Sequence, residues 1–321
     1  MANRTWPDLP LAAWQPTRDT LHMWLQIVGK TLLAGVPSQN HWWHTALRVT
    51  PRGLASLPGT SDERAFDLEI DLIEHQLGVR TSDGRWMSMP LVAQPVRAFY
   101  EEYMALLSAL GLDVHIWTMP VEVPDPIPFE RDDVHREYDQ GWAHRFWQAL
   151  VVSDRVLREL SASFVGKQSP VHFFWGSMDL AATRFSGRRA PERAGTDRMT
   201  REAYSHEVIS FGFWPGGATP DGTRVDEPVF YGYAAPEPDG FPDARVDPPA
   251  RYDRRLHEFF LPYQAVRTAE DPSALVRAFC ESVYDAGATL GRWDRAALER
   301  PADRGRSTAE GASAGVHPRG P

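Results

Sequence analysis

The chain has 321 residues, of which 42% are hydrophobic and 24% are charged, a composition typical of a globular protein with one large core or two ordinary ones. Its formal charge of -9 argues against a broad cationic surface for nucleic acid. The single cysteine, Cys280, excludes an intrachain disulfide and fits a reducing compartment. The sequence shows neither an apolar run of the roughly 20 residues that cross a bilayer nor a signal-peptide core. We therefore expect a cytoplasmic protein with no nucleic-acid or membrane partner.

Apolar periodicity and turn residues predict the secondary structure in chain order. The first half is predicted to begin with a helix at 17–33, followed by four strands at 41–50, 65–72, 76–82 and 85–91. A second helix at 95–110, ended by Gly111, and a last strand at 113–118 complete it. The second half is predicted to form a long helix at 140–164, four strands at 171–183, 206–214, 228–234 and 258–263, and a closing helix at 272–290. Because turns rather than helices join consecutive strands, the pattern indicates an α+β fold of mostly antiparallel sheets with flanking helices.

Three pairs of similar segments recur in the same order in both halves: 28–30 with 165–167, 40–49 with 171–180, and 96–99 with 276–279. This self-similarity predicts an internal duplication that gives two related halves. We expect five segments: an N-terminal segment (1–16), a first repeat (17–118), a proline-rich connector (119–139), a second repeat with inserted loops (140–299) and a disordered tail (300–321).

The two lysines, Lys30 and Lys167, both end a Val-Gly-Lys segment in a chain that otherwise uses arginine. A lysine ammonium can bind a phosphate or carboxylate, or lose its proton when desolvated. Both are therefore candidate substrate-binding residues facing one seam between the halves. Alternatively, each is a cation placed at the C-terminal end of a helix.

The predicted strand at 171–183 carries an acidic residue among aromatic ones. Strand alternation would place Trp175 and Asp179 on one face. A carboxylate in apolar surroundings needs a cation or takes a raised pKa. Asp179 is thus a candidate catalytic residue with Trp175 as a substrate contact, unless it pairs with Arg48, its counterpart in the first half, or is simply exposed.

The segment Tyr204–Glu207 supplies the other candidate catalytic residues, His206 and Glu207, as acid–base groups or metal ligands. Adjacent strand residues point to opposite faces, so these two cannot easily bind one metal together. A structural histidine is the alternative. Whether the protein binds a metal or a cofactor is left open by the sequence.

Arginines crowd the segment that follows Asp179, and they include Arg184 and Arg188. In an acidic chain such a reversal of charge could guide an anionic substrate, because the guanidinium fork fits carboxylate and phosphate oxygens. A solvated charged loop is the alternative. No P-loop, GxGxxG, GxSxG or HExxH spacing is present, so the common ATPase, dinucleotide, serine-hydrolase and zincin classes lose support.

Several long motifs resemble a bacterial family known as domain of unknown function 5996: NHWWH, HFFWGSMDLAATRFSGRR, AYSHEVISFGFWPGG and IWTMPVEVPDPIPF. The resemblance extends from Trp6 to about Pro301 and implies no assigned activity or catalytic residue. From the residues alone we expect a small-molecule enzyme with an acid–base or metal-assisted site between the two repeats, acting on an anionic substrate. The alternative is a non-catalytic module that binds an apolar or aromatic small molecule.

Overall fold

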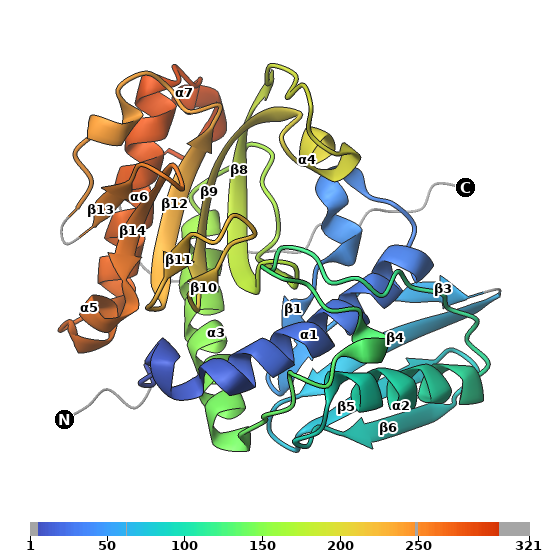
Figure 1. The fold of residues 1–321 in the computed structure, drawn as a ribbon. Helices are drawn as coiled ribbons and strands as arrows, with labels where there is room; N and C mark the ends of the chain where they lie inside the picture. Colours follow the sequence, from blue (N-terminus) through green and yellow to red (C-terminus); the bar gives the residue numbers. More distant parts are fainter. Residues whose placement is uncertain (1–5, 62, 248–249, 302–321) are drawn as a thin grey trace, which may run out of the picture.

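Two antiparallel sheets with their own helices build the protein in a computed structural model, which describes residues 6–61, 63–247 and 250–301. Helix α1 (Leu11–Gly35) runs between the two sheets, and helix α2 (Val96–Ala109) covers one face of the first sheet (Figure 1). The first sheet has the order β1-β2-β4-β5-β6, with β3 also paired to β4. Its strands are β1 (Arg48–Val49), β2 (Gly53–Ala55), β3 (Gly59–Ser61), β4 (Arg64–Asp71), β5 (Gln76–Thr81) and β6 (Trp86–Pro90).

The second sheet has the order β13-β14-β12-β9-β8-β7, and all of its neighbours are antiparallel. Two helices, α3 and α6, pack on each other and on one face of this sheet (Figure 1). These elements are α3 (Gln140–Ser161), β7 (His172–Phe174), β8 (Asp179–Arg189), β9 (His206–Trp214), β12 (Val229–Ala235), β13 (Arg251–Asp253), β14 (Glu258–Pro262) and α6 (Pro272–Leu290).

Short elements complete the described chain. They are η1 (Asn40–Thr45), η2 (Phe129–Arg131), α4 (Arg198–Ala203), β10 (Gly217–Ala218), β11 (Arg224–Val225), η3 (Phe241–Asp243), α5 (Tyr263–Thr268) and α7 (Arg295–Leu298). The connector at 119–139 contains only η2 as a regular element, as its prolines predict. Among the described residues, no helix is long and apolar enough to cross a membrane.

The core is continuous between the two sheets. A pair of backbone hydrogen bonds between Leu47 and Phe173, at 2.9 and 2.8 Å, ties the edge of the first sheet to β7. The same buried cluster includes Trp24 of α1, Phe99 of α2, and Phe146 of α3. Trp24 stacks on Phe99 with 4.7 Å between ring centroids, and Trp14 of α1 packs on Phe146 with 5.2 Å between centroids, so α1 joins the packing of both halves.

Most predicted elements are confirmed, and three strand predictions are wrong. The predicted strand at 41–50 is instead the 3-10 helix η1 followed by the short β1, and residues 113–118 form no strand. The predicted strand at 171–183 is a hairpin, because the turn Trp175–Met178 folds β8 back on β7 so that Asp179 pairs with Phe174. Trp175 and Asp179 therefore do not alternate along one strand.

The α+β class is confirmed, whereas the internal duplication is not shown. The segment at 40–49 contains η1, but its predicted counterpart at 171–180 forms a hairpin. Lys30 lies within α1, five residues before its end, whereas Lys167 lies in a loop after α3, so the two lysines are not equivalent helix ends. The N-terminal segment boundary falls inside α1, and most of the predicted disordered tail, residues 302–321, lies outside the described residues.

Candidate functional site

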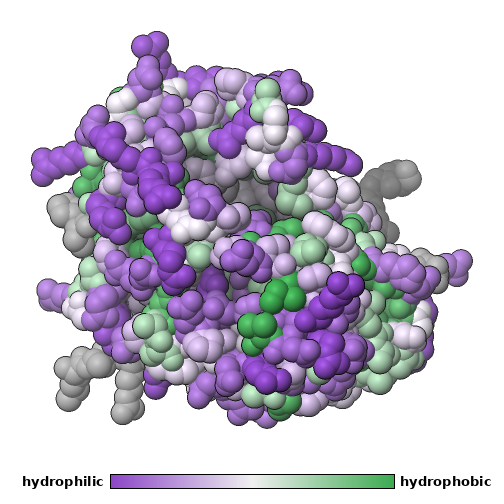
Figure 2. Space-filling view, in the orientation of Figure 1, coloured by the Kyte–Doolittle hydropathy of each residue, from purple (hydrophilic) through white to green (hydrophobic). Residues whose placement is uncertain are grey.

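One face of the second sheet carries most of the candidate residues. Strand alternation directs Asp179, Thr183 and Phe185 of β8 away from the face covered by α3 and α6. Neighbouring strands add Ser210 of β9 and Tyr233 of β12, which pair in register, to this open face. The surface in front of β8 and β9 is hollowed, between the β10–β11 hairpin and α4 (Figure 2).

Asp179 lies at one end of this open face and is only 9% exposed. The hydroxyls of Ser177 and Tyr231 each donate a short hydrogen bond to its carboxylate. Burial raises the pKa of Asp179, and these two hydrogen bonds oppose the shift by stabilising the charged form. No ion pair joins Asp179 to a cation in the described parts of the chain, and Arg48 instead donates to the carbonyl of Ser56 at 3.3 Å.

Two glutamates that the sequence reading missed lie near Asp179. Burial and the Asp179 charge raise the pKa of Glu122 to about 7 and that of Glu258 to about 8. Glu122 comes from the connector and remains accessible to solvent. Glu258 is the first residue of the aromatic strand β14, as Asp179 is the first residue of β8. This shared position could have identified Glu258 as a candidate from the sequence.

Helix α1 fixes the connector at Glu122. The Gln26 side chain donates to the carbonyl of Val121 at 2.6 Å and accepts from its amide at 2.8 Å. Gly176 lets Glu122 approach the turn before Asp179, because a Cβ at Gly176 would lie 2.5 Å from Glu122 Oε1. Glu122 has a φ of 57°, a conformation uncommon for a residue other than glycine, so these contacts hold a strained backbone in place.

Tyrosines form the wall beside these carboxyl groups. The Tyr231 and Tyr233 rings stack with 6.2 Å between centroids, and the Tyr233 hydroxyl lies 3.1 Å from that of Tyr204. Burial raises the pKa of Tyr231 and Tyr233, so both stay protonated and able to donate hydrogen bonds near neutral pH. The recess thus combines hydroxyl donors, three carboxyl groups and aromatic surface.

The other end of the open face is basic. Lys167 Nζ lies 2.8 Å from His41 Nε2, and His41 Nδ1 lies 3.2 and 3.3 Å from the carbonyls of Glu202 and Ala203. These contacts assign the proton of His41 to Nδ1, because carbonyls accept and the ammonium donates. The His206 ring packs on His41 with 5.8 Å between centroids. Burial lowers the pKa of Lys167, and burial followed by the Lys167 charge lowers those of His41 and His206.

The structure does not bring Asp179, His206 and Glu207 into one site. Leu180, next to Asp179, pairs with Phe213, whereas His206 pairs with Arg189 at the opposite end of β8 and β9. At about 3.4 Å per residue the separation along the strands is about 25 Å. This corrects our expectation of a joint site built from these three side chains.

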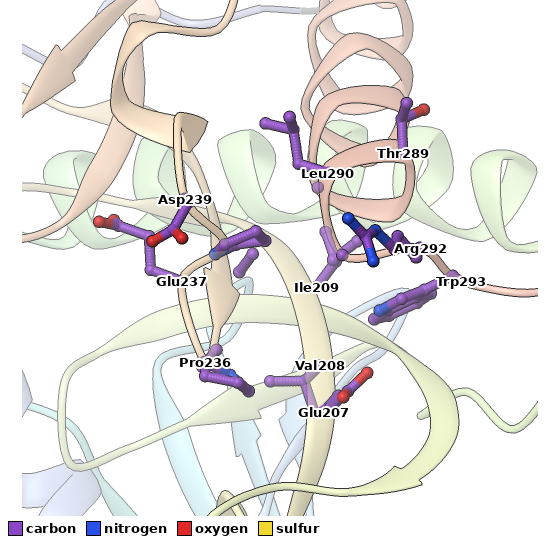
Figure 3. Close-up of a pocket in the computed structure, with 15 residues that line it drawn as sticks. Glu207, Val208, Ile209, Pro236, Glu237, Asp239, Thr289, Leu290, Arg292 and Trp293 are labelled. Carbon is purple, nitrogen blue, oxygen red and sulfur yellow. The ribbon is translucent and has the colours of Figure 1, made fainter.

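Glu207 lies instead at a separate pocket of about 530 Å³ near the end of α6. Arg188 Nε donates to Glu207 at 2.9 Å, and Arg188 Nη1 donates to the Arg292 carbonyl at 2.9 Å. Figure 3 shows Glu237 across this pocket from Arg292 and Trp293. Arg188 and Glu207 therefore cross-link β8, β9 and the end of α6.

The remaining candidate residues lie apart from the recess. Arg184 is buried on the helix-covered face of β8, where it donates to the Leu160 carbonyl at 2.8 Å. Trp175 is buried against Gly29 and donates to the Thr45 carbonyl at 2.9 Å. Lys30 is buried with its Nζ 4.6 Å from the Trp117 ring centroid, and desolvation lowers its pKa to about 8.

Within residues 6–61, 63–247 and 250–301, no group of three or more His, Cys, Asp or Glu residues could hold a metal ion.

The fold and the recess define an α+β protein with a carboxyl-rich centre on the open face of one sheet. A family model described as a family of unknown function (DUF5996) matches residues 6–300, so the chain belongs to this family. Neither a curated protein nor a solved structure matches the chain.

Proposed function

We propose that this protein is a small-molecule enzyme whose acid–base centre is formed by Asp179, Glu258 and Glu122. The observation that carries the proposal is the convergence of three carboxyl groups from β8, β14 and the connector in one recess, without a cation paired to Asp179 among the described residues. A structural role would favour one carboxylate paired with a cation, whereas here the charge of the unpaired Asp179 raises the pKa of both Glu122 and Glu258.

The centre can supply an acid and a base at the same pH. Asp179 accepts hydrogen bonds from Ser177 and Tyr231, which favour its ionised form and suit it to take a proton. Glu258, with a pKa of about 8, retains its proton near neutral pH and can donate it. Because the groups interact, their titration belongs to the centre as a whole.

The recess favours a neutral or cationic reacting group. The ionised Asp179 repels an anion, and the tyrosine hydroxyls and rings offer hydrogen bonds and aromatic contact. The anionic substrate expected from the arginine-rich segment has no support at this centre, because Arg184 faces the helices and Arg188 pairs with Glu207. Any anionic part of a substrate would have to reach the basic end near Lys167.

The direct test is turnover of a mixed metabolite extract, followed by untargeted mass spectrometry. We expect Asp179→Asn to abolish metabolite changes that the parent produces. Asp154→Asn is the matched control, because Asp154 is also 9% exposed with a pKa raised by burial, but it lies on α3 and binds Arg158. Equal turnover by the parent and Asp179→Asn, or no turnover by the parent, would contradict the proposal.

The stacked pair Tyr231 and Tyr233 supports a second candidate function, a non-catalytic module for an aromatic molecule. The same experiment separates the two candidates. A module would deplete a metabolite in proportion to protein without forming a product, whereas an enzyme would convert many equivalents.

A further inference from the structure

A small cavity lies between α1, the connector and the β10–β11 hairpin, and it is separate from the carboxyl recess. Its volume is about 120 Å³, room for roughly four water molecules at about 30 Å³ each. The charged and titratable side chains in its wall are Arg18, Asp19, His22, Asp125, His135 and Arg224.

Arg18 is the least satisfied of these groups. Its side chain is 7% exposed, and its Nη1 donates to Asp19 at 2.8 Å. Its buried Nε has no hydrogen-bond partner among the described residues, and none of the described side chains or carbonyls accepts from Nη2. Nε and Nη2 form one edge of the guanidinium, and two parallel N–H donors on that edge match the two oxygens of a carboxylate.

Gly217 of β10 makes room for the guanidinium group of Arg18. A Cβ at Gly217 would lie 2.5 Å from Arg18 Nη2, and the φ of 133° is one that side-chain-bearing residues rarely adopt. The hairpin can therefore approach Arg18 closely without displacing the guanidinium.

His22 adds an acceptor one helical turn after Arg18. Its Nε2 lies 2.8 Å from the Gly176 carbonyl and 3.2 Å from Gln26 Nε2. The shorter contact assigns the proton to His22 Nε2, because a carbonyl only accepts and Gln26 Nε2 already donates to the Val121 carbonyl at 2.6 Å. Burial, followed by the Arg18 charge, lowers the pKa of His22 to about 3, so the ring is neutral. Its Nδ1 is then a buried acceptor, and it has no partner among the described residues.

We propose that this cavity binds a small carboxylate with a hydrogen-bond donor on the neighbouring carbon, that is, a 2-hydroxy or 2-amino acid. The carboxylate pairs with the Nε–Nη2 edge of Arg18, and the hydroxyl or amino group donates to His22 Nδ1. Positions i and i+4 of α1 place both groups on one side of the helix, as this bidentate arrangement requires.

The other charged groups around the cavity are compatible with such a ligand. Asp19 is already paired with Arg18, Arg224 with Asp226 at 3.0 Å, and His135 with Asp132 at 2.7 Å. Asp125 forms no ion pair with the described residues. Its charge favours a ligand that carries an ammonium group, such as an amino acid, over a ligand with a second carboxylate. The cavity's size restricts the ligand to a few heavy atoms. This inference does not depend on the proposed function.

Calorimetry on the full chain can test the site with four probes: glycolate, glycine, acetate and ethylene glycol. We expect glycolate or glycine to bind at least about tenfold more tightly than acetate, which lacks the donor, and than ethylene glycol, which lacks the carboxylate. In the parent protein, the ¹⁵N resonance of His22 Nδ1 should shift on binding, because that atom gains a donor.

Arg18→Lys keeps the charge but removes the two-donor edge, so it should weaken binding at least about tenfold. The control is Arg267→Lys, because Arg267 also has a buried Nε without a partner among the described residues but lies on α5, outside the cavity. If Arg18→Lys fails to fold, the His22 resonance in the parent still decides the question. No binding and no His22 shift with any probe, or equal affinity for glycolate, glycine and acetate, would overturn the assignment.

Discussion

The Tyr231 hydroxyl reaches Asp179 by crossing strand β9 at Gly212. Tyr231 on β12 pairs with Gly212, which pairs in turn with Ala181 on β8. A Cβ at Gly212 would overlap the end of the Tyr231 ring and the Leu180 carbonyl, so this crossing requires a residue without a side chain. The hydrogen bond that positions the Asp179 carboxylate therefore depends on a glycine in the middle of the sheet.

Gly212→Ala should accordingly disturb both the sheet and the centre. We expect it to lower the free energy of unfolding by about 1–3 kcal/mol through overpacking, measured by denaturant titration. Tyr231→Phe removes only the hydroxyl that donates to the Asp179 carboxylate and should cost about 1.5–3 kcal/mol while leaving the ring in place. If Gly212→Ala is as stable as the parent, the close approach of Tyr231 to Gly212 is wrong.

The basic end of the open face offers a separate prediction by NMR titration. Because the Lys167 charge lowers the pKa of both His41 and His206, Lys167→Met should raise both pKa values. Arg189 lowers the pKa of His206 and is not among the causes of the His41 shift. Arg189→Met is thus the matched control and should raise the pKa of His206 alone. Unchanged histidine titrations in Lys167→Met would contradict the contact between Lys167 and His41.

Local patterns predicted the regular elements well. The helix at 272–290 and the strand at 206–214 coincide with α6 and β9, because capping residues and apolar periodicity act within a few residues. The strand predicted at 41–50 failed because His41 and Trp42 adopt positive φ values near 60°, which no propensity of these residues signals.

The candidate site was predictable only in part, because its geometry depends on contacts distant in sequence. Asp179 was identified as a buried carboxylate that needs a partner, but its partner Tyr231 is 52 residues away and reaches it across another strand. Glu122 was hidden in a proline-rich segment whose position is set by Gln26 of α1. Linear alternation also misplaced Trp175, since the turn at 175–178 reverses the chain.

Cys280 should be inert in the folded protein. It is fully buried in the core on α6, and burial raises the pKa of its thiol to about 12. Because the thiolate is the reactive form, a thiol reagent such as dithionitrobenzoate should label Cys280 only as fast as the protein unfolds locally or globally and exposes the thiol. Labelling that reaches completion within seconds in native buffer, at a rate unaffected by denaturant, would contradict the placement of Cys280.

The pH dependence of stability gives the most direct check on the carboxyl recess. The pKa of Glu258 rises from an unfolded value of about 4.3 to about 8 in the folded protein, so the folded state holds this proton more tightly. The stabilisation that the bound proton provides is complete below about pH 4.3 and is lost as the pH rises to about 8, with a slope of up to about 1.4 kcal/mol per pH unit.

Glu258→Gln removes this proton-binding group while keeping the shape of the side chain. The variant should therefore gain stability relative to the parent as the pH rises, by on the order of 2 kcal/mol between pH 5 and pH 8. Glu159→Gln is the control, because Glu159 is an exposed residue of α3 paired with Arg277, and its effect should stay within about 0.5 kcal/mol at both pH values. Parallel stability curves for the parent and Glu258→Gln would mean that the pKa of Glu258 is not raised beside Asp179, and the proposed centre would lose its acid.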